Sequence, residues 1–323
     1  PDARYISKLG TEDEERNEEN KLKVALVQSP VWGIFDPPVA LAQLSSCLRE
    51  RGLLVRIFDL NIELYRLRKE EYKSIWAIEQ SSFWHNQNNI SKFFLNNNAL
   101  IEDWVNKIIV FDPQAIGFSV NNASFYSTLE FARKIKQKKP EIKIILGGPM
   151  FLVPADIESI MGNDCIDIIV IGEGEVTFSE LTELLEKGTD VDLCKGIVYK
   201  KEGKIIKTDP RPLINNLDKL PFLDFIDLPL DRYEPPGHLG RHISLMTSRG
   251  CIQNCVFCGP KAYWPGYRSM SGKRIYEEIK YHLQNNPEIE HIEFLDLLFN
   301  GNMKTLNEFC EFIILNPIKL GLR

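Results

Sequence analysis

The sequence lacks any apolar run of the roughly 18 residues that a membrane span requires. No signal peptide precedes the first predicted strand. The formal net charge of -6 gives no electrostatic reason to expect a nucleic-acid partner. We therefore expect a cytoplasmic protein with no membrane span and no nucleic-acid partner.

Cysteine is scarce and unevenly placed. The chain has 7 cysteines, an odd number that does not suit a disulfide framework. Cys251, Cys255 and Cys258 stand together in a CxxxCxxC loop after an apolar strand. No second CxxC pair is present to close a tetrahedral zinc site. A cubane 4Fe-4S cluster takes four thiolates, so the loop predicts either a distant fourth ligand or one iron open to a substrate.

The other cysteines are isolated in the sequence. Each is predicted to be a small core residue, although one could instead serve as a radical-quenching thiol or a methyl carrier. They are Cys47, Cys165, Cys194 and Cys310.

Short apolar strands alternate with amphipathic helices in the first half of the chain, which is typical of a parallel α/β sheet. Strands are predicted at Lys23 to Gln28, Leu54 to Leu60, Ala115 to Val120, Lys143 to Leu146 and Asp167 to Ile171. Helices are predicted at Val39 to Arg51 and at Ser124 to Lys138. We expect a doubly wound, flavodoxin-like domain whose ligand crevice lies beyond the carboxyl ends of strands one and three.

Small and polar residues occupy the loops at that crevice. Ser119, at the end of the third strand, can donate a hydrogen bond. Gly147 and Gly148, after the fourth strand, have no side chain to keep a bulky ligand from the backbone. These residues predict a binding slot rather than a catalytic triad.

The residues around the three thiols narrow the range of proteins that the loop resembles. Phe257 directly precedes the last cysteine, and Gly250 and Gly259 flank the loop. The stretch from Ile243 to Tyr281 resembles the opening of a radical S-adenosylmethionine enzyme. The resemblance implies that the three cysteines bind a 4Fe-4S cluster and that Phe257 packs near the adenine of S-adenosylmethionine. In that family the open iron chelates S-adenosylmethionine, and one-electron reduction cleaves it to a 5′-deoxyadenosyl radical.

A GEGE turn, Gly172-Glu-Gly-Glu175, follows the fifth predicted strand. Taken alone, it is a strand-to-helix turn with acids at a helix N-terminus, where the helix dipole favours them. Together with the cysteine loop it resembles the cobalamin-binding domain that precedes the barrel in many radical S-adenosylmethionine enzymes. The resemblance implies that Gly172, Glu173 and Glu175 lie at the cofactor.

The Asp-x-His-x-x-Gly motif that ligates cobalt in mutases and methionine synthase is absent, and none of the 5 histidines follows the first strand. The resemblance therefore implies cobalamin without a protein histidine ligand. Trp32 and Phe35 could form an apolar wall below the corrin, or could simply cover the sheet edge.

Two further segments divide the chain. The long connection from Ile62 to Trp104 is either a lid over the cofactor or a helical insertion. A predicted hairpin at Gly196 to Thr208 leads into a proline-rich stretch. We expect four parts: an acidic disordered tail (1–21), a cobalamin-binding Rossmann-like domain (22–190), the hairpin and linker (191–240), and the first units of a partial (β/α) barrel (241–323).

The last part contains two predicted strand-helix units. Ser271 is a plausible cap for the first helix, His291 to Phe299 forms the second strand, and Lys304 to Leu315 forms the second helix. Two units cannot close a barrel, so we expect a truncated domain and a fragment that is inactive alone. The resemblance implies that Asp296 lies near the amino group of S-adenosylmethionine; a strand-end cap is the alternative.

These features lead to one functional expectation and two alternatives. The resemblance implies a cobalamin-dependent radical S-adenosylmethionine enzyme, most often a methyltransferase that acts on an unactivated centre of a small molecule or natural product. It also implies an electron donor such as flavodoxin or ferredoxin. A radical cyclase or rearrangement enzyme, and a non-catalytic binding module, remain alternatives. A methylthiotransferase gains no support, because Cys47, Cys165 and Cys194 do not form the further cluster motif of those enzymes.

Overall fold

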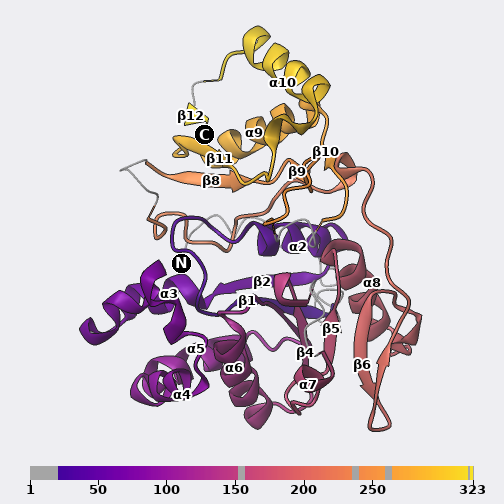
Figure 1. Ribbon diagram of the computed structural model, residues 1–323. Coiled ribbons are helices and arrows are strands. Elements are labelled where there is room, and N and C mark those ends of the chain that lie inside the picture. The colour runs from indigo at the N-terminus through magenta and orange to yellow at the C-terminus, as the bar shows by residue number, and fades with distance from the viewer. Residues whose placement is uncertain (1–20, 152–156, 235–239, 259–263, 319–320, 323) are drawn as a thin grey trace, which may run out of the picture.

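The computed structural model describes residues 21–151, 157–234, 240–258, 264–318 and 321–322. The chain forms two lobes, with the N-terminal part below and the C-terminal part above in Figure 1. The acidic tail expected at 1–21 lies outside the described residues except for Lys21.

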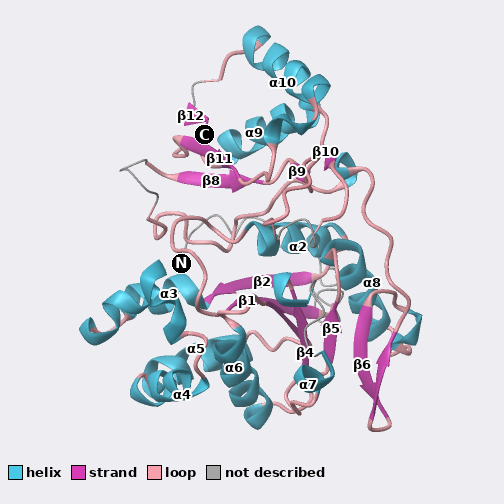
Figure 2. Ribbon diagram, in the orientation of Figure 1, coloured by secondary structure: helices cyan, strands magenta, loops and turns pink. Residues whose placement is uncertain are grey.

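The lower lobe is built on one sheet (Figure 2). The order of its strands is β2-β1-β3-β4-β5-β6-β7. Its strands are β1 (Lys23–Gln28), β2 (Leu54–Asp59), β3 (Ala115–Ser119), β4 (Lys143–Gly147), β5 (Ile168–Val170), β6 (Ile197–Lys201) and β7 (Lys204–Lys207). The first five are parallel in the order 2-1-3-4-5, which confirms the doubly wound, flavodoxin-like prediction. The hairpin expected in the linker instead pairs antiparallel with β5 and extends the sheet.

Helices cover both faces of this sheet (Figure 1). On the face toward the upper lobe lie α2 (Val39–Glu50) and α8 (Gly174–Glu186). On the opposite face lie α4 (Gln87–Asn96), α5 (Asn98–Val110) and α6 (Phe125–Lys138). Two shorter helices, α3 (Leu60–Leu67) and α7 (Ile157–Met161), complete the lobe. The predicted boundaries of α2 and α6 are correct to within one residue.

The long connection between β2 and β3 folds into the core. It contains α3, the 3-10 helices η2 (Glu70–Trp76) and η3 (Ile78–Phe83), α4 and α5. The rings of Trp76 and Trp84 meet edge to face with centroids 5.1 Å apart, and Phe93 packs against both. Since edge-to-face aromatic packing buries large apolar areas, this segment is a packed helical insertion.

The linker is fastened to the lower lobe by charged contacts. Arg49 of α2 forms ion pairs with Asp224 and Asp227. Further along, Tyr233 donates a hydrogen bond to Asp59 at 2.7 Å. These contacts hold the proline-rich stretch against the edge of the sheet at which the predicted crevice lies.

The upper lobe begins a second parallel sheet, with the order β12-β11-β8. The elements are β8 (His242–Leu245), α9 (Gly272–Asn285), β11 (His291–Phe294), α10 (Met303–Leu315) and β12 (Gly321–Leu322). They form the two expected strand-helix units and a third strand. Ser271 caps α9 as predicted, because its side chain accepts a hydrogen bond from the Arg274 N–H.

One apolar core joins the two lobes. It runs from Leu41 of α2 and Phe178 of α8 to Ile243 of β8, Ile279 of α9 and Phe309 of α10. A separate core fills the opposite face of the lower sheet. The shared core buries the side of α2 that faces upward, so it sets the position of the upper lobe over the carboxyl ends of the lower strands.

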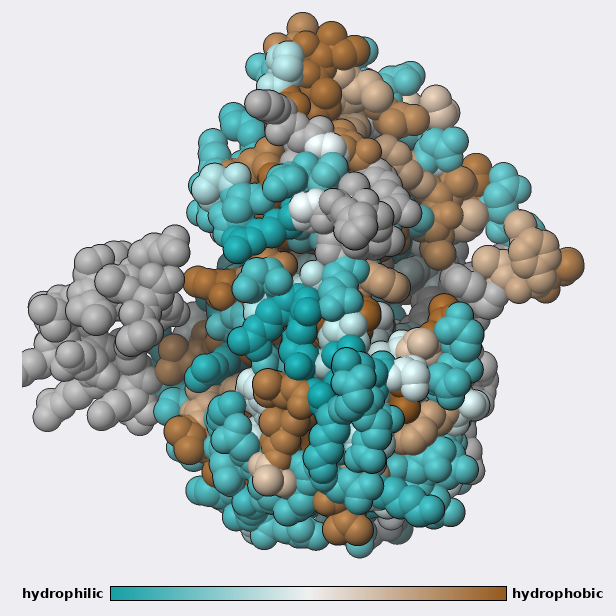
Figure 3. Space-filling model, turned by 90° about the vertical axis from the view of Figure 1, so that its left-hand side faces the viewer, coloured by the Kyte–Doolittle hydropathy of each residue, from teal (hydrophilic) through white to brown (hydrophobic). Residues whose placement is uncertain are grey.

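Hydrophilic side chains cover most of the lower lobe on the face shown in Figure 3. Hydrophobic side chains gather at the top of that view, the end at which Figure 1 places α10. Met303, Ile314 and Leu315 of α10 are exposed. Within the described part of the chain, no helix combines the length and apolar character that a bilayer crossing demands.

Candidate functional site

A cavity of about 650 Å³ lies between the two lobes, at the carboxyl ends of the parallel strands. All six residues predicted for the crevice line it: Ser119, Gly147, Gly148, Gly172, Glu173 and Glu175. The upper lobe contributes Met246, Arg249, Trp264, Leu295 and Leu297. The predicted strand order therefore gave the position of the cavity correctly. It did not predict the lining residues that come from the upper lobe.

The wall of the cavity is largely apolar. Trp32 lines it, while Phe35 is exposed and lies outside the lining. Leu217, Leu220 and Leu223 of the linker close one side. None of the described lining residues is a histidine, and none falls between 62 and 104. The insertion is therefore no lid over the described cavity.

Gly148 needs to be glycine for an internal reason. Its φ is +104°, in the region that side chains disfavour, and an added Cβ would stand 2.8 Å from the Val120 nitrogen. At Gly147 an added Cβ would make an ordinary 3.7 Å contact with Val170. The two glycines were predicted to let a ligand approach; the structure explains Gly148 by the close packing of two strand ends.

An acid that sequence reasoning missed also lines the cavity. Asp59 ends β2, and its carboxylate accepts hydrogen bonds from the Ile62 N–H at 3.1 Å and from the Tyr233 hydroxyl at 2.7 Å. Burial raises the pKa of Asp59 to about 6, and both hydrogen bonds offset this shift only in part. The sequence did contain a signal for Asp59, because this residue is an acid at the carboxyl end of a strand next to β1.

The two acids of the GEGE turn bind arginines from the upper lobe. Glu173 pairs with Arg249 at 2.7 Å and with Arg268 at 2.8 Å, and Glu175 also pairs with Arg249. Burial alone would raise the pKa of Glu173, but the Ile214 N–H and the arginines hold it below its usual value. We call these four residues the arginine clamp. Their carboxylates, which were predicted to lie at the cofactor, line the cavity and also bind these guanidinium groups.

The cysteine loop rises from a short antiparallel pair, β9 (Ser248–Arg249) and β10 (Arg268–Ser269). Arg249 and Arg268 face each other in this pair, so the clamp holds the base of the loop. Gly250 follows with φ +80°, and a Cβ there would collide with the Gly266 carbonyl. The loop can leave β9 at this sharp angle only because residue 250 is glycine.

The three cysteines that are predicted to hold a cluster lie near the surface. Cys255 and Cys258 are exposed and Cys251 is half-buried. The Gln253 N–H donates to the Cys251 sulfur at 3.4 Å. Phe257 is exposed as well. Three cysteine sulfurs on one loop, one of which accepts a backbone N–H, form the kind of donor set that iron-sulfur clusters use.

Three comparisons with known proteins bear on the cavity and the cysteine loop. A family model for the B12-binding domain matches residues 86–182. An uncharacterised methyltransferase of Pyrococcus horikoshii is 36% identical over 196 residues, which are 60% of this chain and 42% of the relative. The cobalamin-dependent S-adenosylmethionine radical enzyme OxsB has the same fold, with a TM-score of 0.65 at 21% identity over 96% of this chain and 39% of OxsB.

The chain thus contains a match to the B12-binding domain, and it resembles cobalamin-dependent radical S-adenosylmethionine enzymes in fold.

A second relative is named as a cyclase. The anaerobic magnesium-protoporphyrin IX monomethyl ester cyclase of Synechocystis sp. is 28% identical over 222 residues, 68% of this chain and 43% of the cyclase. The radical S-adenosylmethionine methyltransferase TsrM of Kitasatospora setae shares the fold with a TM-score of 0.60 at 18% identity, over 94% of this chain and 54% of TsrM. The chain thus spans about two fifths of the length of its curated relatives.

Asp296, predicted near S-adenosylmethionine, is engaged within the protein. Its carboxylate accepts hydrogen bonds from the Thr247 hydroxyl at 3.1 Å and from the Ser248 hydroxyl. Burial raises the pKa of Asp296, and these bonds lower it only in part. Its neighbours Leu295 and Leu297 line the cavity, but Asp296 does not. These are the contacts expected from the alternative interpretation, in which Asp296 caps the end of a strand.

The isolated cysteines differ from the loop cysteines. Cys47, Cys165 and Cys194 are buried, and burial raises the pKa of Cys47 to about 12 and that of Cys194 to about 11. Thiols that stay protonated are poor metal ligands, so these three behave as the predicted core residues. The same prediction for Cys310 is wrong, because this cysteine is exposed on α10.

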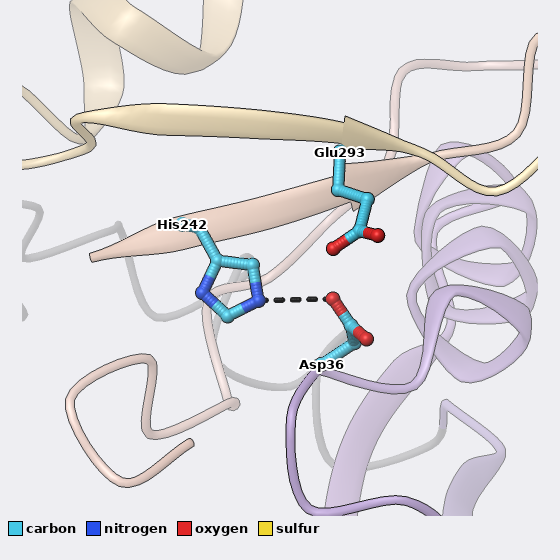
Figure 4. A group of neighbouring side chains, drawn as sticks. All are labelled: Asp36, His242 and Glu293. Atoms are coloured by element: carbon cyan, nitrogen blue, oxygen red, sulfur yellow. Dashed lines mark hydrogen bonds and ion pairs between the residues drawn. The ribbon is translucent and has the colours of Figure 1, made fainter. Parts of the chain in front are cut away.

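A second polar group joins the lobes away from the clamp (Figure 4). Asp36, in the loop after β1, points toward His242 of β8 and Glu293 of β11. One potential ligand atom from each lies within 4.8 Å of the other two. The Asp36 carboxylate lies 2.9 Å from His242 Nε2 and also accepts a hydrogen bond from the Ser244 hydroxyl. We call this the histidine contact, and sequence reasoning missed it because its members are 206 residues apart.

Proposed function

We propose that this chain is the cofactor-binding part of a cobalamin-dependent radical S-adenosylmethionine enzyme that transfers a methyl group to an unactivated centre of a small molecule. One observation carries the proposal: Arg249 lines the inter-lobe cavity and also starts the cysteine loop, two residues before Cys251. A corrinoid in the cavity and a cluster on the loop would therefore be neighbours.

The cysteine loop fits a 4Fe-4S cluster. Cys251, Cys255 and Cys258 would hold three of its irons, and their partial exposure leaves room for the fourth iron to meet S-adenosylmethionine. Burial raises the pKa of Cys47, Cys165 and Cys194, so these lower-lobe thiols are poor candidates for a fourth ligand.

The cavity fits part of cobalamin. Its apolar wall would cover a hydrophobic ring system, and Asp59 and Ser119 offer hydrogen bonds at the strand ends. A corrinoid in this cavity would lie among described lining residues that include no histidine. Trp32 lines the cavity and would be an apolar neighbour of the corrinoid where other proteins have a histidine ligand.

The cofactors carry the difficult chemistry in such an enzyme, since the cluster supplies the electron that cleaves S-adenosylmethionine to a radical and cobalamin supplies the methyl carrier. The protein's residues align and shield. Leu217, Leu220, Leu223 and Leu295 line the cavity and would exclude water from a corrinoid bound there. The β9-β10 pair fixes the height of the loop above the cavity.

A cyclase is the second candidate, because the Synechocystis cyclase aligns with 68% of this chain. Both candidates would use the same cluster and the same cavity. They separate on the fate of S-adenosylmethionine: a methyltransferase forms S-adenosylhomocysteine as well as 5′-deoxyadenosine, whereas a cyclase forms 5′-deoxyadenosine without net methyl transfer. An electron donor such as flavodoxin or ferredoxin belongs to either proposal.

Anaerobic reconstitution tests the shared part of the proposal. The chain is incubated with iron, sulfide and hydroxocobalamin, unbound material is removed, and the visible spectrum and iron content are measured. Cluster and corrin absorption together are expected. Cys255→Ala should lose the cluster and keep the corrin, and Cys310→Ala is the matched control that should keep both. A chain that binds neither cofactor would overturn the proposal.

A further inference from the structure

The arginine clamp bridges two segments with different predicted roles. Glu173 and Glu175 belong to the GEGE turn on the cavity wall, and Arg249 and Arg268 form the base of the cysteine loop. Arg268 also donates to the Ile214 carbonyl at 2.7 Å, so the linker shares in the same contact. The clamp is therefore a direct polar connection between the cavity and the loop.

Burial makes this connection rigid. The four side chains are between 6% and 11% exposed. Burial opposes the charge on Arg249, but Glu175 and Glu173 outweigh it and raise the pKa of Arg249. A buried ion pair adds little net stability compared with apolar packing, but breaking it leaves a charge uncompensated. Such a network mainly restricts which arrangement of the two segments is allowed.

Arginine suits this position because one planar guanidinium can bind two carboxylates at once. Arg249 uses Nη1 for Glu173 and Nη2 for Glu175. Since Gly250 turns sharply against Gly266 directly after Arg249, a shift of the guanidinium would move the start of the cysteine loop. By these contacts, a movement of the GEGE turn would reach Cys251.

We propose that Arg249 is a positioning residue that couples occupancy of the inter-lobe cavity by a corrinoid to the order of the cysteine loop. This inference rests on the proposed function, since it requires that the cavity bind a corrinoid. Coupling is reciprocal, so cluster assembly on the loop would in turn tighten corrinoid binding. Arg249 acts through Glu173, Glu175 and the loop and need not touch a reacting atom.

Hydrogen exchange of the backbone amides between 250 and 258 tests the coupling. The full chain, reconstituted with iron and sulfide without oxygen, is compared with and without saturating hydroxocobalamin. In the wild type, hydroxocobalamin is expected to slow exchange in the loop by about fivefold or more, the lower end of typical coupling between sites. In Arg249→Gln the same addition should change exchange less than about twofold, although hydroxocobalamin still binds.

Two further variants distinguish a loss of coupling from a folding defect. Arg249→Lys keeps the charge but cannot hold both carboxylates in one plane, so it should retain part of the coupling. Arg211→Gln breaks the ion pair with Glu180 of α8, away from the loop, and should leave the coupling intact. A purely structural role for Arg249 would change loop exchange equally with and without hydroxocobalamin.

The outcomes separate the two proposals. If wild-type protein binds no hydroxocobalamin, the proposed function fails and the coupling fails with it. If wild-type and Arg249→Gln proteins both bind it and show the same slowing of the loop, the coupling alone is overturned.

Discussion

The two polar contacts between the lobes differ in the kind of charge that they use. The arginine clamp joins two guanidinium groups to two carboxylates, with every side chain at most 11% exposed. The histidine contact joins Asp36, 27% exposed, to His242 through one carboxylate oxygen. Guanidinium stays charged at every pH that a protein tolerates and presents several donors in one plane, whereas the His242 ring offers a single nitrogen to Asp36. The clamp is thus a permanent connection, and the histidine contact is a weaker one.

The arginine clamp and the histidine contact also lie at different places in the interface between the lobes. The clamp lies where the cysteine loop leaves the upper lobe, and the histidine contact lies on β8 and β11 away from the loop. Chemistry that needs two cofactors in register demands precision at the first place more than at the second. The clamp therefore marks the part of the interface whose geometry matters most for the proposed function.

Breaking the clamp should have the largest effect on folding. Arg249→Gln leaves Glu173 and Glu175 buried with less compensation, so the free energy of unfolding should fall by about 3 kcal/mol. Urea denaturation followed by circular dichroism measures it, with Arg211→Gln as a control expected to lose about 1 kcal/mol or less. Equal losses in the two variants would contradict the distinction between the clamp and an ordinary ion pair.

Asp59 offers an intermediate case, because it is buried like the clamp but accepts hydrogen bonds from neutral donors and has no guanidinium partner. Its pKa is raised to about 6, so its contribution to stability is fully present below about pH 4 and is lost as pH rises through 6. Asp59→Asn should remove this pH dependence and stabilise the protein at pH 8 by about 3 kcal/mol at most. Thermal denaturation between pH 4 and pH 8 measures the difference.

Tyr233→Phe is the matched variant for this prediction. The Tyr233 hydroxyl lowers the pKa of Asp59, so its removal should move the loss of stability to higher pH. Parallel pH profiles for the wild type, Asp59→Asn and Tyr233→Phe would show that Asp59 does not titrate in this range.

The histidine contact should give a smaller effect. Asp36→Asn keeps an acceptor for His242 and Ser244 but removes the negative charge, so the loss should be about 1 kcal/mol. Urea denaturation at constant pH measures it. A loss as large as that of Arg249→Gln would remove the distinction between the two contacts.

Cys255→Ala should have the smallest effect on stability and complete loss of the cluster. Cys255 is exposed and its side chain packs against little, so the free energy of unfolding should change by about 0.5 kcal/mol or less. Iron content after reconstitution should fall to background, whereas the clamp variants should retain iron. A folding defect in Cys255→Ala would mean that the loop supports the lobes, contrary to the clamp's proposed role.

Much of the fold could be predicted because it depends on local pattern. The strand Lys23–Gln28 matches its prediction residue for residue, and Ser271 caps α9 as expected. The hairpin was predicted as a hairpin but placed in the linker, since pattern alone does not reveal that β6 pairs with β5. The insertion stayed undecided for the same reason, because only packing shows that Trp84 is buried.

The sequence by itself determined the parallel sheet, the crevice at its carboxyl edge and the cysteine loop, since short-range periodicity and motif spacing encode all three. Only the tertiary structure decided what the GEGE acids bind. Glu173 and Arg249 lie 76 residues apart, and no local pattern specifies that their charges meet. The shared apolar core places one lobe over the other, and the buried ion pairs then select a single arrangement, because a charge without its partner would be costly there.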